Sequence, residues 1–268
     1  MNKETFQIYN ELSLEDWRQA WIDHVEGKES KVNLPPFPSA EVQKITNNCD
    51  GRKTIEAAWE MYRIFSEEVA KYNLDDSSSP ISVLDLGAGW GRITRLMLKD
   101  VQPSNLYAVD VDNKLVKSGK KCLPDVNWGL IKAGKPLPFE DNTFSLVLSN
   151  SVLSHLDYEH HMGMVKEVSR VLKPGGIYLG TTLSENHFLN YMKYPDLTKW
   201  LEGMIGNLDE QLEQLRGGEF VYGHSNRLQG YGMTFLPDNW ANENWKPYLD
   251  VQETRTDYSQ DVQVAQKL

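Results

Sequence analysis

Residues 83–94 read Val-Leu-Asp-Leu-Gly-Ala-Gly-Trp-Gly-Arg-Ile-Thr, an apolar strand that runs into a glycine-rich turn and the predicted start of a helix near Trp90. The alternate glycines, Gly87, Gly89 and Gly91, permit positive φ angles and let a ligand lie against bare main chain. Free N–H groups at the start of a helix favour a polar or anionic ligand. The stretch therefore predicts a strand, a turn and a helix that hold a nucleotide-like cofactor.

The sequence beyond this stretch alternates between strands and helices. Five short apolar runs are typical of strands, at residues 81–86, 106–111, 126–131, 144–149 and 177–182. Helical patterns lie between most of them, at residues 92–98, 113–120 and 159–172, and Lys173-Pro174-Gly175-Gly176 is expected to end the last one. Residues 248–254 and 260–265 predict a closing antiparallel hairpin. The expected fold is α/β, a Rossmann-like doubly wound sheet of about seven strands, mostly parallel, with ligands at the carboxyl ends of the strands.

A helical extension is predicted over residues 1–79, before an α/β domain that we expect to span residues 80–268. Ser13 and Ser39 are predicted helix caps, and apolar side chains recur at helical spacing after Ser13 and again over residues 55–69. The polar stretch 75–79 precedes a proline and predicts the boundary between the two parts.

Residues 185–239 form a long connection between the fifth strand and the closing hairpin. Large aromatic and imidazole side chains are frequent in it: Phe188, Tyr191, Tyr194, Trp200, Tyr222, His224 and Tyr231. Two interpretations stay open for this insertion, a helical lid over an acceptor or a helical brace with packed aromatic rings. A lid of this composition suits a sugar or another polyhydroxylated acceptor.

The composition excludes several classes of protein. The 268 residues include 38 acidic and 28 basic side chains, and the formal net charge of -10 argues against nucleic acid as a partner. Cys49 and Cys122 provide neither a disulfide framework nor a metal site. We therefore expect no metal, and we expect a reducing, cytoplasmic location. No apolar run approaches the roughly 18 residues of a membrane span. A small molecule is the expected partner.

Two residues beside the glycine turn distinguish between cofactors. In a dinucleotide fingerprint the third glycine follows the second by three positions, but Arg92 stands there. This disfavours a nicotinamide-linked oxidoreductase. Asp110 closes the predicted second strand, where a carboxylate can accept hydrogen bonds from both hydroxyls of a ribose.

The order of four motifs resembles that of the class I S-adenosylmethionine-dependent methyltransferases. The motifs are the strand and turn at residues 83–91, Asp110, the Leu-Pro-Phe segment at 137–139, and Leu-Lys-Pro-Gly-Gly at 172–176. The resemblance covers residues 80–183, and more loosely the closing hairpin. Residues 89–92 and 151–156 are also similar to bacterial methyltransferases encoded near genes for glycan assembly. The two resemblances together imply S-adenosylmethionine as the cofactor and a small molecule or a glycan as the acceptor.

The resemblance also implies roles for the residues of the first two strands. Asp85 would hold the turn and approach the methionine ammonium group, and Asp110 would bind the ribose hydroxyls. The turn itself, Gly87, Ala88, Gly89 and Gly91, would pass beneath the methionine and the ribose. Val111 would pack on the adenine face.

Further roles fall on residues that follow the third and fourth strands. Ala133 and Gly134 align with the place where family members commonly carry an acid for the adenine amino group, so backbone groups are expected to take over that contact. Asn150 and Ser151 end the fourth strand and would face the methionine and the acceptor.

The resemblance implies direct transfer of an activated methyl group, for which an oxygen acceptor of high pKa also needs a base. His155 is the leading candidate for that base, followed by His187 and His224, although a hydrogen-bonded structural role for His155 stays open. Alternatives are an N-methyltransferase of a small amine and a non-catalytic protein that only binds the cofactor. Trp90 is expected to pack on the N-terminal helices and Arg92 to be an ion-paired helix residue. His160 and His161 are expected in solvent.

Overall fold

The structure is a computed structural model that describes residues 1–74, 80–224 and 231–268. Within this described part the strands of the main sheet follow the order β3-β2-β1-β4-β5-β9-β8, and a separate pair is formed by β6 and β7. The chain divides into two compact units, residues 1–133 with 144–148 and residues 134–143 with 149–268. We describe each unit by itself.

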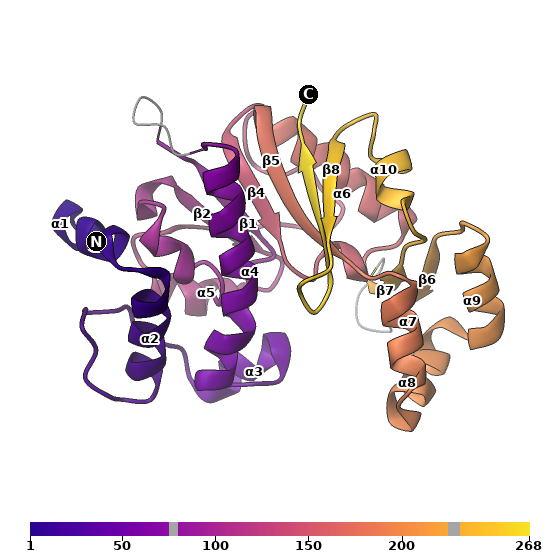
Figure 1. The fold of residues 1–268 in the computed structure, drawn as a ribbon, viewed down its shortest axis with the longest axis horizontal. Coiled ribbons are helices and arrows are strands. Elements are labelled where there is room, and N and C mark those ends of the chain that lie inside the picture. The colour runs from indigo at the N-terminus through magenta and orange to yellow at the C-terminus, as the bar shows by residue number, and fades with distance from the viewer. Residues whose placement is uncertain (75–79, 225–230) are drawn as a thin grey trace. The chain divides into compact units, whose positions relative to one another are not determined.

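The first unit carries the parallel strands and the N-terminal helices (Figure 1). Its strands are β1 (Val83–Leu86), β2 (Leu106–Asp110), β3 (Asn127–Leu130) and β4 (Phe144–Ser149), whose last residue already belongs to the second unit. β1 pairs in parallel with β2 and β4, and β2 with β3. The helices are α1 (Lys3–Glu11), α2 (Leu14–Val25), α3 (Ala40–Asn47), α4 (Arg52–Lys71), α5 (Asn113–Cys122) and the short 3₁₀ helices η1 (Leu96–Lys99) and η2 (Pro103–Asn105).

The N-terminal helices follow the predicted apolar stripes. Ser13 caps α2, because its hydroxyl oxygen accepts a hydrogen bond from the Asp16 N–H at 3.0 Å. Ser39 occupies the same position before α3, but its side chain forms no capping hydrogen bond. Helix α1 lies within the predicted helical extension, although no separate helix was predicted before Ser13. The predicted linker at 75–79 lies outside the described residues, and the domain boundary there stays a prediction.

The prediction of a helix at residues 92–98 is wrong. The chain continues from the glycine turn through further turns to residue 95 and then enters η1. Gly91 has φ +86° and donates to the Ala88 carbonyl, a three-residue spacing that does not start an α-helix. The Arg95 guanidinium also donates to the Gly91 carbonyl, at 3.1 Å. No α-helix therefore begins directly after the glycine turn.

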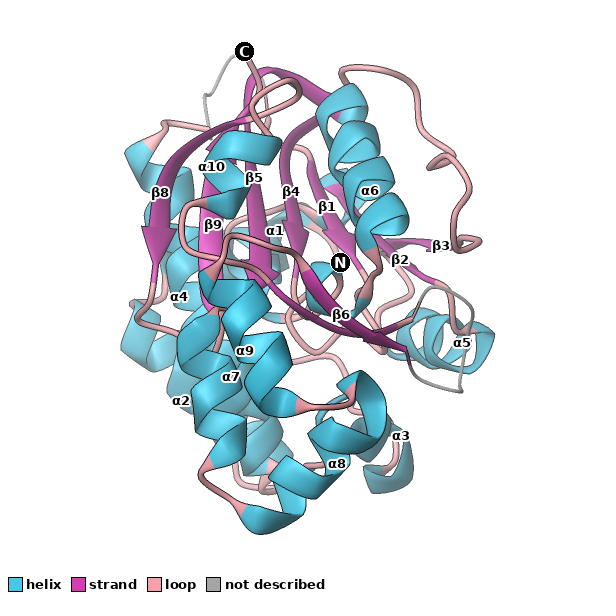
Figure 2. Ribbon diagram, turned by 90° about the vertical axis from the view of Figure 1, so that its right-hand side faces the viewer, coloured by secondary structure: helices cyan, strands magenta, loops and turns pink. Residues whose placement is uncertain are grey.

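The second unit contains the antiparallel part of the sheet and most of the later helices (Figure 2). The strand β9 (Asp261–Gln266) lies antiparallel to both β5 (Leu172–Thr182) and β8 (Asp250–Arg255). The other elements are η3 (Leu153–His155), α6 (Tyr158–Val171), α7 (Glu185–Met192), α8 (Pro195–Ile205), α9 (Leu208–Arg216), β6 (Val221–His224), β7 (Gly232–Phe235) and α10 (Trp240–Asn244). The mostly parallel sheet with a closing antiparallel hairpin is confirmed.

β5 begins five residues earlier than the sequence predicts, at Leu172 directly after α6. The Lys-Pro-Gly-Gly segment thus ends the helix as expected but is already part of the strand. Its backbone is paired with the chain end, because Gly175 N–H donates to the Lys267 carbonyl and Lys267 N–H donates to the Gly176 carbonyl. This pairing involves residues far apart in the sequence, which no local pattern reveals.

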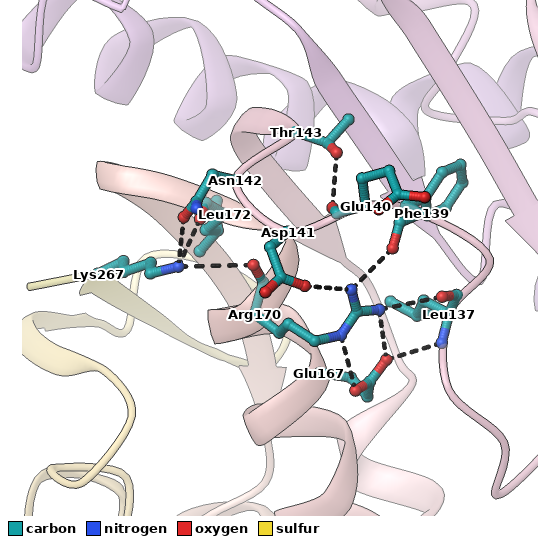
Figure 3. A network of polar contacts seen from close by, with 10 residues as sticks. All are labelled: Leu137, Phe139, Glu140, Asp141, Asn142, Thr143, Glu167, Arg170, Leu172 and Lys267. Atoms are coloured by element: carbon teal, nitrogen blue, oxygen red, sulfur yellow. Dashed lines mark hydrogen bonds and ion pairs between the residues drawn. The ribbon is translucent and has the colours of Figure 1, made fainter.

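The Leu-Pro-Phe segment is fixed to α6 by Arg170 (Figure 3). The guanidinium of Arg170 donates to the carbonyls of Phe139 at 2.7 Å and Leu137 at 3.0 Å, and it forms an ion pair with Glu167 at 2.8 Å. Glu167 in turn accepts the Leu137 N–H at 2.8 Å, and Arg170 lowers the pKa of the Glu167 carboxyl. The motif therefore has a structural reason, since one arginine satisfies the backbone of a segment without secondary structure.

The insertion at 185–239 packs around a hydrophobic core of its own. Phe188 and Phe235 are fully buried at its centre and meet edge to face, with 5.0 Å between ring centroids. Two of the predicted aromatic residues point elsewhere, because Tyr194 is 55% and Trp200 46% exposed. The core consists of Leu183, Phe188, Leu201, Ile205, Leu208, Leu212, Leu215, Val221, Met233 and Phe235.

Substitution of Gly223 by alanine is expected to destabilise the protein by about 1–3 kcal/mol through overpacking. A Cβ atom on Gly223 would lie 2.0 Å from the Ile205 Cγ2 atom and 2.9 Å from the Met204 backbone. Gly203 on α8 is the matched control, because a Cβ there meets nothing within 4 Å. Gly203→Ala should stabilise by up to about 1 kcal/mol through helix propensity. Urea unfolding of both variants checks the pair, and equal stability of the two would contradict this packing.

Candidate cofactor and acceptor sites

The glycine turn is built by backbone conformations that favour glycine. Gly87, Gly89 and Gly91 have φ angles of +76°, +58° and +86°. The N–H groups of Gly87 and Ala88 both donate to the Val109 carbonyl of β2, at 2.9 and 3.0 Å. The turn is therefore anchored on the carboxyl end of the neighbouring strand.

Asp110 is brought directly to this turn. Its Oδ2 atom accepts the Gly89 N–H at 2.8 Å, and its Oδ1 atom accepts the Asp112 N–H at 2.8 Å. Burial raises the pKa of Asp110, while these N–H groups act in the opposite direction. Each oxygen keeps a second lone pair, so the carboxylate can still accept hydroxyl groups of a ligand.

Asp85 lies inside the first unit behind the turn. It is 2% exposed, and its Oδ2 atom accepts the Thr94 hydroxyl at 2.5 Å. Burial raises the pKa of Asp85 to about 6, against the lowering effects of the Thr94 hydrogen bond and the Arg92 charge. A cation bound next to Asp85 would therefore strongly stabilise the ionised form of its carboxyl group.

Asp85→Asn is expected to remove a pH-dependent cost from the free protein. The folded pKa of about 6 lies above the usual value of 3.8, so wild-type stability falls as the pH rises between these values. Relative to wild type, the variant should gain up to about 3 kcal/mol between pH 4 and pH 7.5. Urea unfolding at both pH values measures the change, and a constant difference between the two proteins would refute it.

The N-terminal helices cover the glycine turn within the first unit. Trp90 is fully buried and donates from Nε1 to the Thr46 hydroxyl at 3.1 Å, which confirms its predicted packing on these helices. A Cβ atom on Gly89 would lie 2.8 Å from the Thr46 Cγ2 atom. Arg95 is enclosed by aromatic rings, with its guanidinium 4.2 Å from the Phe37 centroid and 4.8 Å from that of Trp90.

The prediction of an ion-paired Arg92 is wrong. Among the described residues Arg92 forms no ion pair, and its Nη1 atom is buried without a hydrogen-bond partner. The sequence offers no acid at helical spacing, because the positions three and four residues away are Ala88, Gly89, Arg95 and Leu96.

The remaining predicted adenine contacts are open on the surface of their own units. Val111 is 47% exposed directly after β2, an apolar side chain available to a flat ring. Ala133 ends the first unit and Gly134 begins the second, and both are exposed. Gly134 has φ +66°, and a Cβ atom there would lie 3.1 Å from the His160 Nε2 atom.

In the second unit the end of β4 is tied to the tip of the closing hairpin. Ser151 has φ +56°, and its N–H donates to the Thr181 hydroxyl at 2.7 Å. Gln260 donates to the Ser151 hydroxyl at 2.6 Å, and the Tyr258 hydroxyl donates to the Asn150 side chain at 3.0 Å. The sequence analysis missed Tyr258 and Gln260, because a partner more than 100 residues away leaves no local pattern.

His155 has the geometry of an oriented neutral imidazole. Its Nδ1 atom lies 2.8 Å from the Gly232 carbonyl oxygen, which can only accept, so Nδ1 carries the proton. Tyr231 stacks on the ring, with 4.8 Å between centroids and 17° between planes. Burial lowers the pKa of His155. The described residues offer the Nε2 atom no hydrogen-bond partner, and its lone pair can accept a proton.

The other histidines of the second unit have structural surroundings. His187 belongs to the capping box of α7 with Ser184 and lies 3.7 Å from Asp261. His161 is fully buried, which corrects its predicted exposure, and accepts the Trp245 indole N–H at 3.2 Å. It lies on the buried face of α6, because its ring packs against Trp240 and Trp245. His160 is half-buried rather than in solvent and bonds to Asp157 at 2.7 Å, whereas His224 is exposed at the end of β6.

No described helix combines the length and apolarity that crossing a bilayer requires. No cluster of three or more His, Cys, Asp or Glu side chains in residues 1–74, 80–224 and 231–268 is arranged to hold a metal ion.

Comparison with known proteins identifies the class to which this fold and glycine turn belong. Residues 84–180 match the family described as a methyltransferase domain. A structure of an S-adenosylmethionine-dependent methyltransferase from Clostridium acetobutylicum shares the fold, with a TM-score of 0.52, 12% identity and coverage of 76% of this chain and 89% of that one. Residues 84–180 therefore match a methyltransferase domain, and the fold is that of the S-adenosylmethionine-dependent methyltransferases, whose cofactor is S-adenosylmethionine.

Two relatives show how far the similarity extends. Trans-aconitate 2-methyltransferase from Azoarcus sp. (strain BH72) is 28% identical over 130 residues, 48% of this chain and 48% of that protein. A ubiquinone/menaquinone biosynthesis C-methyltransferase from Desulfotalea psychrophila is 36% identical over 104 residues, 37% of this chain and 41% of that protein. The chain thus matches less than half the length of these relatives.

Proposed function

We propose that the protein transfers a methyl group from S-adenosylmethionine to a hydroxyl group of a small-molecule or sugar-type acceptor. The observation that carries the proposal is Asp110, whose two carboxylate oxygens are held at the glycine turn by the N–H groups of Gly89 and Asp112. A carboxylate fixed in this way at the end of the second strand suits the paired hydroxyls of a ribose.

The other residues of the first unit fit the same cofactor. The buried Asp85 carboxyl, with its raised pKa, suits an ammonium group, and the exposed Val111 side chain suits the adenine face. The turn at Gly87, Ala88, Gly89 and Gly91 offers bare backbone for the methionine and the ribose. Ala133, Gly134, Asn150 and Ser151 remain proposed contacts on residue position alone.

His155 favours an oxygen acceptor. When bound, S-adenosylmethionine supplies a methyl group already activated by the sulfonium. The protein then has to align the acceptor, exclude water and take up its proton. With Nδ1 donating to Gly232, His155 keeps Nε2 free to accept that proton, and its lowered pKa keeps it neutral near pH 7.

A small acceptor fits the charge and the relatives. The net charge of -10 opposes binding to a phosphate backbone. One relative is named for trans-aconitate and the other for C-methylation in quinone biosynthesis, so their names share a small acceptor but not the methylated atom. The aromatic residues of the insertion, such as Trp200, support a sugar-type acceptor.

Calorimetry and a turnover screen test the proposal. We expect S-adenosylhomocysteine to bind in the micromolar range and NAD not to bind. A panel of hydroxylated metabolites, sugars and amines is then incubated with labelled S-adenosylmethionine, and methylated product should form with a hydroxyl compound. Absence of cofactor binding rejects the activity. Exclusive methylation of amines would reject the oxygen acceptor, and cofactor binding without transfer to any acceptor would favour a binding protein.

A further inference from the structure

We propose that the N-terminal helical extension carries a second small-molecule site, which binds a neutral aromatic ring bearing an O–H or N–H donor group. The site is a solvent-open cleft of about 490 Å³ in the first unit, a size typical of ligand pockets. Its walls include His24, Val25, Phe37, Ala40, Gln43 and Asp50. The residues proposed for the cofactor, at positions 85–91 and 110–111 of the same unit, are not among the described residues that line the cleft. The inference is therefore independent of the proposed methyl transfer.

Aromatic rings form one wall of the cleft. Trp21 is fully buried and meets the Phe37 ring edge to face, with 5.6 Å between ring centroids and 87° between planes. The His24 ring lies 5.8 Å from that of Phe37 and is tilted by 34°. Phe37 is only partly buried, so it gives the cleft accessible aromatic surface. A flat ring that enters the cleft can pack on this surface in the offset or edge-to-face arrangements that aromatic pairs prefer.

His24 offers a ligand one hydrogen-bond acceptor. Its Nε2 atom lies 3.2 Å from the Pro35 carbonyl oxygen, which can only accept, so Nε2 carries the proton. Burial lowers the pKa of His24, and the charge of Arg95 acts in the same direction, which keeps the imidazole neutral near pH 7. The Nδ1 atom of this tautomer is an acceptor, and the described part of the chain gives it no donor. The group that a ligand presents to His24 is therefore an O–H or N–H donor.

The charges around the cleft favour a neutral ligand. The Asp50 carboxylate already pairs with Lys44, whose Nζ atom lies 3.2 Å away. The Arg95 guanidinium lies 4.2 Å from the Phe37 ring centroid, and its charge opposes a second cation at this wall. An anionic ligand would come close to the carboxylate of Asp50. A neutral ring with a donor group avoids both repulsions.

Gln43 fixes the two ends of α3 and with them the shape of the cleft. Its side-chain Nε2 atom donates to the Pro38 carbonyl before the helix at 2.9 Å, and its Oε1 atom accepts the Gly51 N–H after the helix at 3.0 Å. Gly51 also lines the cleft, and a Cβ atom there would meet nothing within 4 Å. The cleft is thus already formed in the free protein, so a ligand has little ordering to impose on it.

Calorimetry with 2-naphthol and 2-methoxynaphthalene tests the requirement for a donor. The two probes share a flat neutral ring system, and only 2-naphthol carries an O–H group. Wild-type protein should prefer 2-naphthol by about 3- to 10-fold, the range of one neutral hydrogen bond. His24→Leu should abolish this preference, while His24→Gln, which keeps an acceptor, should restore part of it. The charged probes 2-naphthoate and 2-naphthylmethylamine should bind more weakly than 2-naphthol, and tighter binding of either one would overturn the neutral ligand class.

Ala40→Phe tests where the probes bind. Ala40 is exposed at the first position of α3 and lines the cleft, so a phenyl ring there should occupy it and weaken binding of 2-naphthol at least about tenfold. Ala57→Phe is the matched control, because Ala57 is an exposed alanine on α4 outside the cleft, and it should keep wild-type affinity.

Three results would overturn the site: no binding of 2-naphthol to the wild type, unchanged binding to Ala40→Phe, or displacement of 2-naphthol by S-adenosylhomocysteine. If His24→Leu does not fold, the wild-type ratio of the two neutral probes and the Ala40→Phe variant decide. A protein that binds 2-naphthol but not S-adenosylhomocysteine would keep this site and lose the proposed methyl transfer, so the two failures are distinguishable.

Discussion

Asp110→Ala is expected to weaken binding of S-adenosylmethionine by more than about 100-fold. The carboxylate would lose two hydrogen bonds from ribose hydroxyls, each worth about 1.5–3 kcal/mol to a charged acceptor. The substitution also removes the acceptor of the Gly89 N–H, which fixes the glycine turn. Isothermal titration with S-adenosylhomocysteine measures the loss.

Asp112→Asn controls for the loss of a negative charge in the same loop. Asp112 caps α5 by accepting the N–H groups of Lys114 and Leu115, and asparagine caps a helix about as well. Affinity should therefore stay within about threefold of wild type. Wild-type affinity in Asp110→Ala would remove Asp110 from the site, and a thermal unfolding scan of each variant shows whether lost binding reflects lost folding.

His155→Gln is expected to lower the rate of methyl transfer by about 10²- to 10⁴-fold, the usual contribution of a general base. Glutamine can keep a hydrogen bond to the Gly232 carbonyl through its amide but cannot take up a proton. The cofactor Kd should stay unchanged. Initial rates with an acceptor from the turnover screen measure the effect.

The pH dependence of the wild-type rate of methyl transfer tests the role of His155 as a base. Only the neutral imidazole can act as a base, and burial lowers the pKa of His155 below its usual 6.5. The rate should therefore be flat near pH 7 and fall only as the pH drops below 6.5. His160→Gln, which changes a half-buried histidine bonded to Asp157, should keep rate and profile. An unaltered rate in His155→Gln would leave His155 a structural residue.

The parallel strands and the glycine turn were predictable because their signals are local. β4 spans the predicted residues, and the glycines at positions 87, 89 and 91 all take the positive φ angles that their spacing suggested. The contact of Asp110 with the turn was predictable from the geometry of parallel strands. A residue that ends one parallel strand lies at the edge of the sheet where the neighbouring strand also ends.

The errors arose where distant contacts override local patterns. The residues after Gly91 have helical composition, yet Gly91 takes a positive φ angle and the chain continues through turns into η1. His161 was expected in solvent because it lies at the start of a helix, but α6 turns it toward Trp240 and Trp245. The sequence does not encode such pairings at short range.

The strand that closes the insertion also determines the state of His155. Gly232 and Tyr231 both come from this segment, and Leu156 forms a bridge to Tyr231. A displacement of β7 therefore removes the hydrogen bond and the stacked ring from the imidazole together. The position of β7 and the tautomer of His155 are therefore thermodynamically linked. A molecule that binds the insertion and shifts β7 changes the proton affinity of the His155 imidazole.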